Sequence, residues 1–262
     1  MKNAFSLEGK SVAVIGAGSG IGRAVAIGVA EQGAYVYCLD VKGDTAAETA
    51  AMIKKDGGDA DSGVCDIVDA ASVNDAIAKS AAKHNRLDGV VCTPAINVRK
   101  PILKYSGDEF DRVVQVNLRG NFNVLQSAGQ VMVAQGSGSI VLFSSIRSIV
   151  TEPGQSVYSM TKAGILQLVK TAATEWGTKG VRVNAVGPGV IETPLTAPIK
   201  QNPEWYNAYA MKNPMNRWAQ ASEMAGPTVF LLSDAASYIT GTILYADGGW
   251  LAADGRFTPP GM

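Results

Sequence analysis

Short apolar runs alternate with longer amphipathic stretches along most of the chain. The runs are rich in β-branched residues and end in glycine, serine or acidic residues, as is typical of buried parallel strands. Strands are expected at residues 11–16, 35–40, 59–65, 87–92, 139–145, 181–186 and 242–246. Because helical patterns separate consecutive strands, the chain predicts a parallel sheet with right-handed crossovers and helices on both faces.

The helical stretches have the length and polarity of helices that cover a sheet. They are expected at residues 23–32, 44–56, 69–83 and 107–135, and from about 158 to 179. No repeat, linker or low-complexity tract separates these elements, and α/β folds of 262 residues occur as single domains. We therefore predict one α/β domain over residues 1–262.

Composition narrows the classes of function. Lys plus Arg and Asp plus Glu balance at 23 each, which argues against a general nucleic-acid or membrane-surface binder. No signal-peptide pattern or apolar run of about 18 residues appears, so a soluble, cytoplasmic protein is expected. The three cysteines form no CxxC pair, and His84 is the only histidine. Catalysis by a Ser-His-Asp triad and metal sites with several histidines are not expected.

The first predicted strand runs into the spacing Gly16-x-x-x-Gly20-x-Gly22 and then into a helix. Glycines let backbone N–H groups approach a pyrophosphate, and the helix N-terminus adds partial positive charge. The common GxGxxG spacing does not fit, because Ile21 stands where its third glycine would be. The alternative is a glycine-rich turn without a ligand.

The second predicted strand ends in Asp40, 18 residues after Gly22. A carboxylate at this position can bind the ribose hydroxyls of a dinucleotide and would repel a 2′-phosphate. The pattern therefore favours NAD over NADP. The alternative role, capping the following helix, suits Asp44 better.

A group of reactive side chains follows the fifth predicted strand. Ser144 and Ser145 lie at its C-terminal end, where open α/β sheets bind ligands. Tyr158 and Lys162 come next, one helical turn apart on one face. A nearby cation lowers the pKa of a phenol, so Tyr158 is predicted to exchange a proton with the substrate, while Ser145 holds the substrate oxygen.

These elements together resemble the short-chain dehydrogenase/reductase family over about residues 7–250. The resemblance implies a seven-stranded Rossmann fold, a homotetramer or homodimer, and catalysis by Asn117, Ser145, Tyr158 and Lys162. It implies that Lys162 lowers the pKa of Tyr158 and binds the nicotinamide ribose. It also implies that an NAD cofactor contacts Gly16, Ser19, Gly20, Ile21, Gly22, Asp40, Asp66, Ile67, Tyr158, Lys162, Pro188, Gly189, Ile191 and Thr193. From the residues alone, Asn117 either ties its helix to the sheet or orders a proton relay.

The chain departs from the family pattern at two places. Ile15 replaces a threonine before the first glycine, and Cys92-Thr93-Pro94-Ala95 replaces Asn-Asn-Ala-Gly after the fourth strand. Pro94 has no N–H to donate, so we expect the second change to affect cofactor affinity.

The substrate is predicted from residues near the catalytic serine. Arg147 is expected to bind a substrate carboxylate or hydroxyls, with Arg99 and Lys100 as weaker candidates and a salt bridge to Glu152 as the alternative. Among relatives in the family, sugar-acid and polyol dehydrogenases of the gluconate 5-dehydrogenase type are favoured. A 3-oxoacyl-thioester reductase and a non-catalytic dinucleotide-binding scaffold are the other two hypotheses.

The sequence leaves the roles of two segments undecided. Residues 190–218 form either a substrate lid or a packing surface for helices or subunits. The tail of residues 251–262 is either a surface end or a cover for a neighbouring subunit's site.

Overall fold

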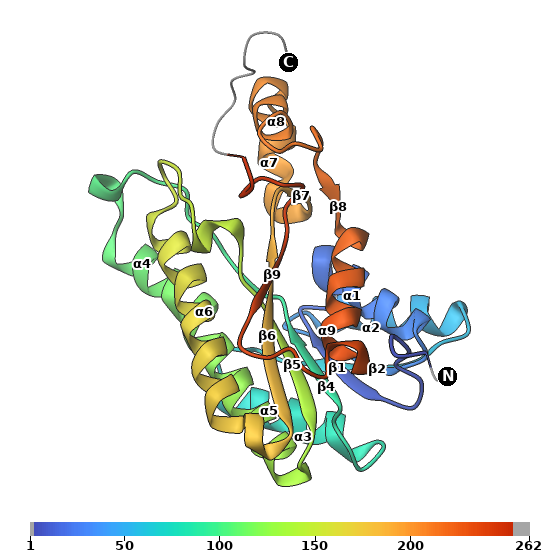
Figure 1. Ribbon diagram of the computed structural model, residues 1–262. Helices are drawn as coiled ribbons and strands as arrows, with labels where there is room; N and C mark the ends of the chain where they lie inside the picture. The colour runs from blue at the N-terminus through green and yellow to red at the C-terminus, as the bar shows by residue number, and fades with distance from the viewer. Residues whose placement is uncertain (1–2, 254–262) are drawn as a thin grey trace.

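The computed structural model describes residues 3–253 of the protein, and a parallel sheet forms its centre (Figure 1). Seven strands hydrogen-bond in the order β3-β2-β1-β4-β5-β6-β9, every neighbouring pair parallel. They are β1 (Ser11–Ile15), β2 (Tyr35–Asp40), β3 (Asp59–Val64), β4 (Gly89–Cys92), β5 (Gly138–Phe143), β6 (Val181–Pro188) and β9 (Ile243–Ala246). The predicted Rossmann-type sheet is confirmed, with each strand end within two residues of its expected position.

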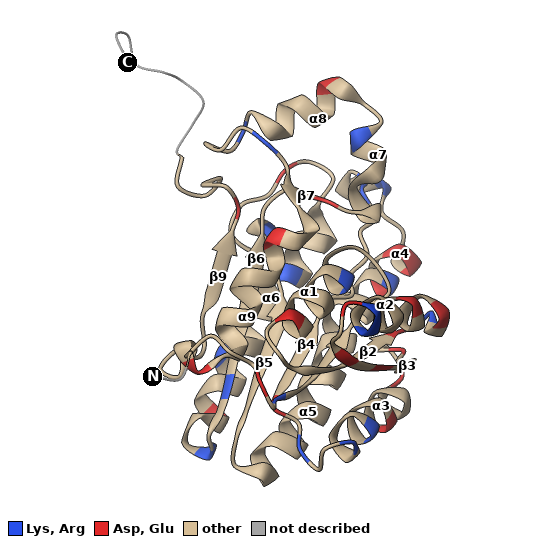
Figure 2. Ribbon diagram, turned by 90° about the vertical axis from the view of Figure 1, so that its right-hand side faces the viewer, with Lys and Arg blue, Asp and Glu red and all other residues tan. Residues whose placement is uncertain are grey.

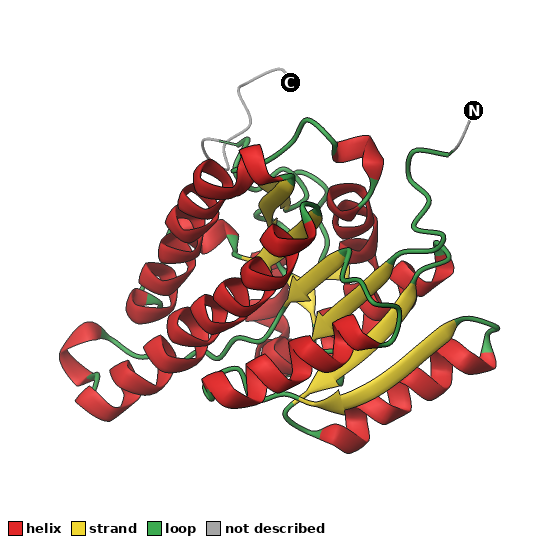
Figure 3. Ribbon diagram, turned by 90° about the horizontal axis from the view of Figure 1, so that it is seen from below, coloured by secondary structure: helices red, strands yellow, loops and turns green. Residues whose placement is uncertain are grey.

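Helices cover both faces of the sheet, as Figure 3 shows from below. They are α1 (Gly20–Glu31), α2 (Gly43–Lys55), α3 (Ala70–Ala82), α4 (Gly107–Val114), α5 (Asn121–Gln135), α6 (Ser156–Trp176), α7 (Ala197–Lys200), α8 (Pro203–Ala210) and α9 (Ala225–Leu232). Apolar side chains of α1, α2 and α9 form the core on one face, and those of α3, α5 and α6 form the core on the other. Figure 2 shows residues of both charge signs mixed along the elements.

One predicted helix differs from expectation. Residues 107–135 form α4 and α5 joined by a π-helical turn, Gln115–Gly120, instead of one regular α-helix. The turn contains Asn117, whose side chain bonds the loop after β4. A π-turn inserts an extra residue and is frequent at functional sites, and apolar periodicity alone does not predict it.

A small third core lies beyond the C-terminal ends of the central strands. The chain leaves β6 through β7 (Ile191–Glu192), forms α7 and α8, and returns through β8 (Ala219–Gln220), which pairs parallel with β7. Buried Tyr209, Trp218 and Trp250 pack with Ile146 and Ile199. Residues 190–218 therefore fold against the end of the sheet where the predicted catalytic residues lie (Figure 1).

Several other expectations can be compared with residues 3–253. Within this range no helix is long and apolar enough to cross a membrane, and no cluster of His, Cys, Asp or Glu is arranged to hold a metal. The three cysteines are buried free thiols. The predicted tail, residues 251–262, lies outside the described residues except for its first three positions.

Candidate active site

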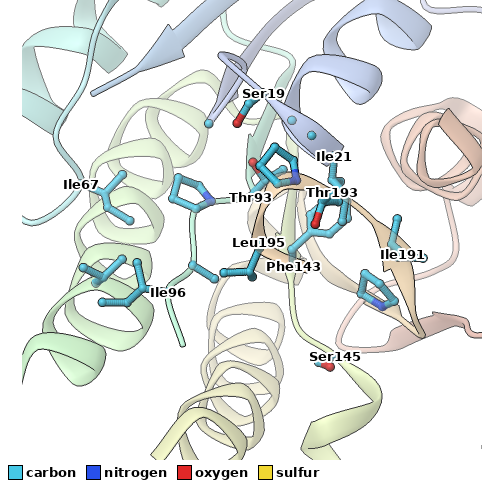
Figure 4. A pocket seen from close by; sticks show the side chains of 18 of the residues that line it. Ser19, Ile21, Ile67, Thr93, Ile96, Phe143, Ser145, Ile191, Thr193 and Leu195 are labelled. Atoms are coloured by element: carbon cyan, nitrogen blue, oxygen red, sulfur yellow. The ribbon is translucent and has the colours of Figure 1, made fainter. Parts of the chain in front are cut away.

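The main cavity opens where the order of the strands reverses. From β1 the chain builds outward to β2 and β3, then returns to β4 on the other side of β1. Crossovers that leave a sheet in opposite directions create a crevice at the strand ends, which is where open α/β sheets bind ligands. This crevice contains a cavity of about 570 Å³. Figure 4 shows Ser19 and Ser145 at opposite ends of it.

Every residue predicted to contact the cofactor lines this one cavity. These residues are Gly16, Ser19, Gly20, Ile21, Gly22, Asp40, Asp66, Ile67, Tyr158, Lys162, Pro188, Gly189, Ile191 and Thr193. They come from β2, β6, β7, α1, α6 and the loops after β1, β3, β6 and β7. The fold therefore brings together residues that are far apart in the sequence.

The glycine turn is shaped so that backbone approaches backbone. Gly16 has φ +87°, which favours glycine. A Cβ on Gly22 would lie 1.9 Å from the Gly16 carbonyl oxygen, and one on Gly18 would lie 2.7 Å from Asp40 Oδ2. The missing side chains leave a cradle at the start of α1, where backbone N–H groups and the helix dipole favour a pyrophosphate.

Asp40 is held at the end of β2 by two backbone amides. Its Oδ2 accepts from Gly18 N at 3.0 Å and its Oδ1 accepts from Lys42 N at 3.0 Å. The carboxylate is therefore fixed beside the glycine turn and still lines the cavity. This placement fits a group that binds the ribose hydroxyls of a dinucleotide.

Thr93 joins β4 to β1 at the bottom of the crevice. Its backbone N and its Oγ1 both donate to the Ile15 carbonyl oxygen, at 3.1 and 3.0 Å. A Cβ on Gly16 would meet Thr93 Oγ1 at 2.3 Å and the Pro94 ring at 3.0 Å, so this segment packs directly under the glycine turn. The altered Cys92-Thr93-Pro94-Ala95 segment thus keeps a link between the two strands, although Pro94 provides no N–H.

The predicted catalytic pair lies at the other end of the cavity. Ser145 follows β5 and Tyr158 lies on the first turn of α6, and both line the cavity. The Ser145 hydroxyl lowers the pKa of the Tyr158 phenol, which places the two groups close together. Ser145 Oγ also accepts from Arg147 N at 3.1 Å, which fixes the orientation of the side chain. The neighbouring Ser144 hydroxyl instead donates to the Lys162 carbonyl oxygen at 2.8 Å. Ser145, and not Ser144, is therefore the serine whose hydroxyl acts on the phenol.

Lys162 is one turn further along α6 and is buried, with 2% of its surface exposed. Its Nζ donates to the Phe143 carbonyl oxygen at 2.8 Å and lies 5.6 Å from the centre of the Tyr158 ring. Burial penalises the charged ammonium and lowers the pKa of Lys162 to about 8.

The predicted lowering of the Tyr158 pKa is not found. Burial raises the pKa of Tyr158 above its ordinary value, and three groups oppose this shift only in part: the Ser145 hydroxyl, then the charges of Arg147 and Arg99. Lys162 is not among them. The sequence identified the helical spacing of Tyr158 and Lys162, but the folded chain brings two arginines from other segments close to the phenol.

Asn117 is buried and connects three parts of the site. Its Oδ1 accepts from Ile96 N, and its Nδ2 donates to the Ile96 carbonyl oxygen, both at 2.9 Å. The same Nδ2 donates to Thr161 Oγ1 on α6 at 3.1 Å. Its side chain therefore fixes the loop after β4 against α6, a structural role whose partners are this loop and α6 rather than the sheet. The proton-relay role stays a prediction.

Arg147 forms the salt bridge that was the alternative to substrate binding. Its Nη2 lies 2.8 Å from Glu152 Oε2. Arg99 pairs with the same carboxylate at 2.7 Å, whereas Lys100 pairs with a different carboxylate, that of Glu109 on α4. Arg147 and Arg99 thus converge on Glu152 near the catalytic pair.

Sequence reasoning missed several residues at the site. Leu195 and Thr196 line the cavity, and Leu195 is half exposed at 51%. Tyr209 was grouped with a possible lid, but its hydroxyl donates to Glu152. An apolar Leu195 directly after Pro194 was the only local signal, and the Tyr209–Glu152 contact joins positions 57 residues apart.

The geometry defines a class of protein: an oxidoreductase that uses a dinucleotide. The glycine cradle, the fixed Asp40 and the Ser145–Tyr158 pair share one cavity whose shape and donors fit NAD or NADP. Comparisons with known proteins agree. A family model described as enoyl-(acyl carrier protein) reductase matches residues 16–251.

Named relatives match over almost the whole chain. A 2-dehydro-3-deoxy-D-gluconate 5-dehydrogenase of Pseudoalteromonas atlantica is 36% identical, covering 96% of this chain and 99% of the relative. A 3-oxoacyl-[acyl-carrier-protein] reductase of Thermotoga maritima is also 36% identical, covering 93% and 98%.

A solved structure is also similar over almost the whole chain. It is a gluconate 5-dehydrogenase of Burkholderia cenocepacia in complex with NADP and tartrate, with a TM-score of 0.92, 32% identity and coverage of 95% and 98%. The chain belongs to the short-chain dehydrogenase/reductase family. It is an oxidoreductase with NAD or NADP as its cofactor.

Proposed function

We propose that the protein interconverts a secondary alcohol and a ketone on a small polyhydroxylated substrate, a sugar acid or a polyol, with NAD as its cofactor. One observation carries the proposal: the Ser145–Tyr158 pair and the dinucleotide cradle line the same cavity. Relatives named for gluconate derivatives support the substrate class.

Tyr158 is the proposed acid and base. Its phenol and the Ser145 hydroxyl line the same end of the cavity, so a substrate oxygen placed there meets both groups. In alcohol oxidation Tyr158 accepts the hydroxyl proton, and in ketone reduction it returns a proton to the carbonyl oxygen. Ser145 donates a hydrogen bond to the same oxygen as negative charge develops on it.

The other two members of the proposed catalytic set act on position and charge. Lys162 lines the cavity and is fixed by its bond to the Phe143 carbonyl oxygen, so its ammonium is available to ribose hydroxyls. Asn117 holds the loop after β4 against α6. The nicotinamide, when bound, supplies or accepts the hydride. Pro188, Gly189, Ile191 and Thr193 form the wall against which its ring would lie.

NAD is proposed over NADP because of Asp40. A 2′-phosphate would bring negative charge against a carboxylate that two backbone amides hold in place. Arg23, the nearby cation on α1, is already bonded to the Gly18 carbonyl oxygen and Glu48. NADP occurs in the Burkholderia cenocepacia relative, so the dissociation constants of both cofactors have to be measured.

A 3-oxoacyl-thioester reductase is the second candidate function, favoured by the relative of that name in Thermotoga maritima. Reduction of a 3-oxoacyl thioester would need room for a long acyl chain, whereas the charged side chains of Arg99, Arg147 and Glu152 lie close to Tyr158. A non-catalytic scaffold would not require a serine hydroxyl that acts on the phenol.

The substrate panel is the decisive experiment. The protein is incubated with NAD or NADP and with D-gluconate, D-glucitol, D-threitol or simple secondary alcohols, and absorbance of the reduced cofactor is followed. We expect turnover with NAD and a sugar acid or polyol. Turnover only in the reductive direction, with a 3-oxoacyl thioester and NADPH, would establish the second candidate. Absence of turnover in both directions would favour the scaffold.

We propose that the protein assembles as a homotetramer or homodimer. A surface groove of about 380 Å³ between α5 and α6 is lined by Leu125, Val133, Leu168 and Trp176, with Phe122 exposed beside it. A second copy of this chain is the proposed occupant, because apolar faces of this kind favour burial in an interface. Sedimentation velocity should give a dimer or tetramer, and a monomer at micromolar concentration would contradict the proposal.

A further inference from the structure

A network of charged side chains lies beside the catalytic pair, centred on Glu152. The two carboxylate oxygens of Glu152 are used unequally. Its Oε1 accepts from Arg99 Nη1 at 2.7 Å, from Gln155 Nε2 at 2.9 Å and from the Tyr209 hydroxyl. Its Oε2 pairs with Arg147 Nη2 at 2.8 Å. Glu152 would therefore keep three partners if Arg147 turned away.

Arg147 is the member of the network closest in sequence to the reacting groups. It lies two residues after Ser145, and its backbone N–H donates to the Ser145 hydroxyl oxygen. Its side chain is 7% exposed, and its guanidinium carbon lies 5.4 Å from the centre of the Trp250 ring. A guanidinium has five N–H donors. Within residues 3–253, its one ion pair is with Glu152.

The network carries an excess of positive charge. Two guanidinium groups, on Arg147 and Arg99, face one carboxylate, on Glu152, which leaves a net charge of +1 in a largely buried place. Lys212 adds a further cation on Trp250, with Nζ 5.3 Å from the ring centre. Buried charge without a counter-ion is costly, so an anionic ligand is favoured there.

One amide oxygen at the edge of the network lacks a hydrogen-bond partner among the described residues. Asn97 donates to Gln155 Oε1 at 2.8 Å, but its own Oδ1 is buried and has no hydrogen-bond partner among the described residues. Buried carbonyl oxygens are usually satisfied in native proteins. A ligand or water that donates a hydrogen bond would complete the network.

We propose that Arg147 selects an acidic over a neutral polyhydroxylated substrate, and that Glu152 holds its guanidinium until the substrate carboxylate takes the place of Glu152 Oε2. This inference rests on the proposed oxidoreductase function. Because Oε1 of Glu152 stays bonded to Arg99, Tyr209 and Gln155, the exchange requires only Arg147 to move. A planar guanidinium suits a carboxylate, which it can bind through two parallel N–H groups.

The test compares D-gluconate with D-glucitol, which share a six-carbon polyol chain and differ in one carboxylate. Dissociation constants are measured by calorimetry with the NAD-loaded protein, and KM values are measured in parallel. Arg147→Gln should raise the gluconate dissociation constant by about tenfold or more, since hydrogen bonds to charged groups contribute about 1.5–3 kcal/mol. The glucitol value should change less than about twofold, since a neutral ligand does not use the charge.

Glu152→Gln gives the sharper result. Removing the competing carboxylate should strengthen gluconate binding by about three- to tenfold, in proportion to the weakened ion pair. Arg147→Lys keeps the charge and should recover part of the gluconate affinity, which controls for a merely structural role. The matched controls are Arg112→Gln on α4 and Glu31→Gln on α1, both exposed and outside the Glu152 network, with both affinities expected unchanged.

Several outcomes would overturn the inference. These are equal changes for gluconate and glucitol in Arg147→Gln, weaker gluconate binding in Glu152→Gln, or no gluconate binding to the unaltered protein. The calorimetric arm separates this inference from the proposed function. Selective gluconate binding without turnover would refute only the function, and turnover without carboxylate selectivity would refute only the role of Arg147.

Discussion

The two ends of the main cavity are built in different ways. The dinucleotide end consists of backbone and glycines from consecutive elements, β1, α1 and β2, with one carboxylate fixed by amides. The predicted substrate end holds Ser145 and Tyr158, and beside it Arg99, Arg147, Glu152 and Tyr209, from three segments of the chain, contact one another. The first end depends on local conformation and the second on long-range packing. Changes at one end should therefore leave the other end working.

The largest effect is expected from Ser145→Ala, which breaks the substrate end. Loss of a hydrogen bond to the developing oxyanion should lower kcat by about 100- to 1000-fold. The dissociation constant of NADH, measured by fluorescence, should stay unchanged because the cradle is intact. Ser144→Ala is the matched control, since its hydroxyl bonds the Lys162 carbonyl oxygen, and it should cost much less. Equal losses in the two variants would contradict the assignment.

Gly22→Ala breaks the dinucleotide end instead. The new Cβ would lie 1.9 Å from the Gly16 carbonyl oxygen, so the turn has to shift. We expect a loss of about 1–3 kcal/mol in the free energy of unfolding, as for other overpacked sites, together with loss of NADH binding. Gly226→Ala on α9, where a Cβ would meet nothing within 4 Å, is the control. Unimpaired NADH binding by Gly22→Ala would show that the turn is not the cradle.

Asp40→Ala sharpens the comparison within the dinucleotide end. Without the carboxylate, the dissociation constant of NAD should rise about tenfold through lost ribose hydrogen bonds. That of NADP should fall, because the repulsion of a 2′-phosphate is removed. Titration of both cofactors into the same variant checks this. An unchanged preference between the two would mean that Asp40 does not select the cofactor.

Lys162→Met should change the free energy of unfolding, and we expect this change to be smaller than the effects above and to depend on pH. The pKa of Lys162 falls from its ordinary value of 10.5 to about 8 in the folded protein. Between these values the unfolded chain binds one more proton than the folded chain, so Lys162 makes stability rise as pH rises from 8 to 10.5. The burial penalty is therefore largest below pH 8.

The variant removes that penalty, so its stability relative to the unaltered protein should be greatest at pH 7 and decline toward pH 10. Urea unfolding of both proteins at several pH values measures the difference. A difference that stays constant with pH would show that Lys162 is not the titrating group.

The sequence predicted the dinucleotide end well because its signals are local. The glycine spacing and Asp40 lie on consecutive elements, and apolar runs fixed the seven strands of the sheet. Tyr158 and Lys162 were found because four-residue spacing on a helix places them together. All the predicted cofactor residues line one cavity, although contact with the cofactor itself stays a prediction.

The substrate end was only partly predictable. Arg147 was singled out together with its possible partner Glu152, which lies five residues away, and that ion pair is present. The bonds of Glu152 to Arg99 and Tyr209 span 53 and 57 residues, and no sequence periodicity encodes them. For the same reason, sequence reasoning attributed a lowered pKa of Tyr158 to Lys162, its neighbour on the helix. The π-turn that carries Asn117 was likewise not predicted, and its hydrogen bond to Ile96 spans 21 residues.

The most direct test of the account is a paired measurement on Tyr158→Phe. The variant keeps the ring and loses only the hydroxyl that lines the cavity beside Ser145. With saturating NAD and D-gluconate, kcat should fall by more than about a thousandfold, the scale of lost acid–base catalysis. The dissociation constant of NADH, measured on the same sample, should not change. Turnover that persists while NADH binding is intact would contradict the claim that this phenol carries the proton.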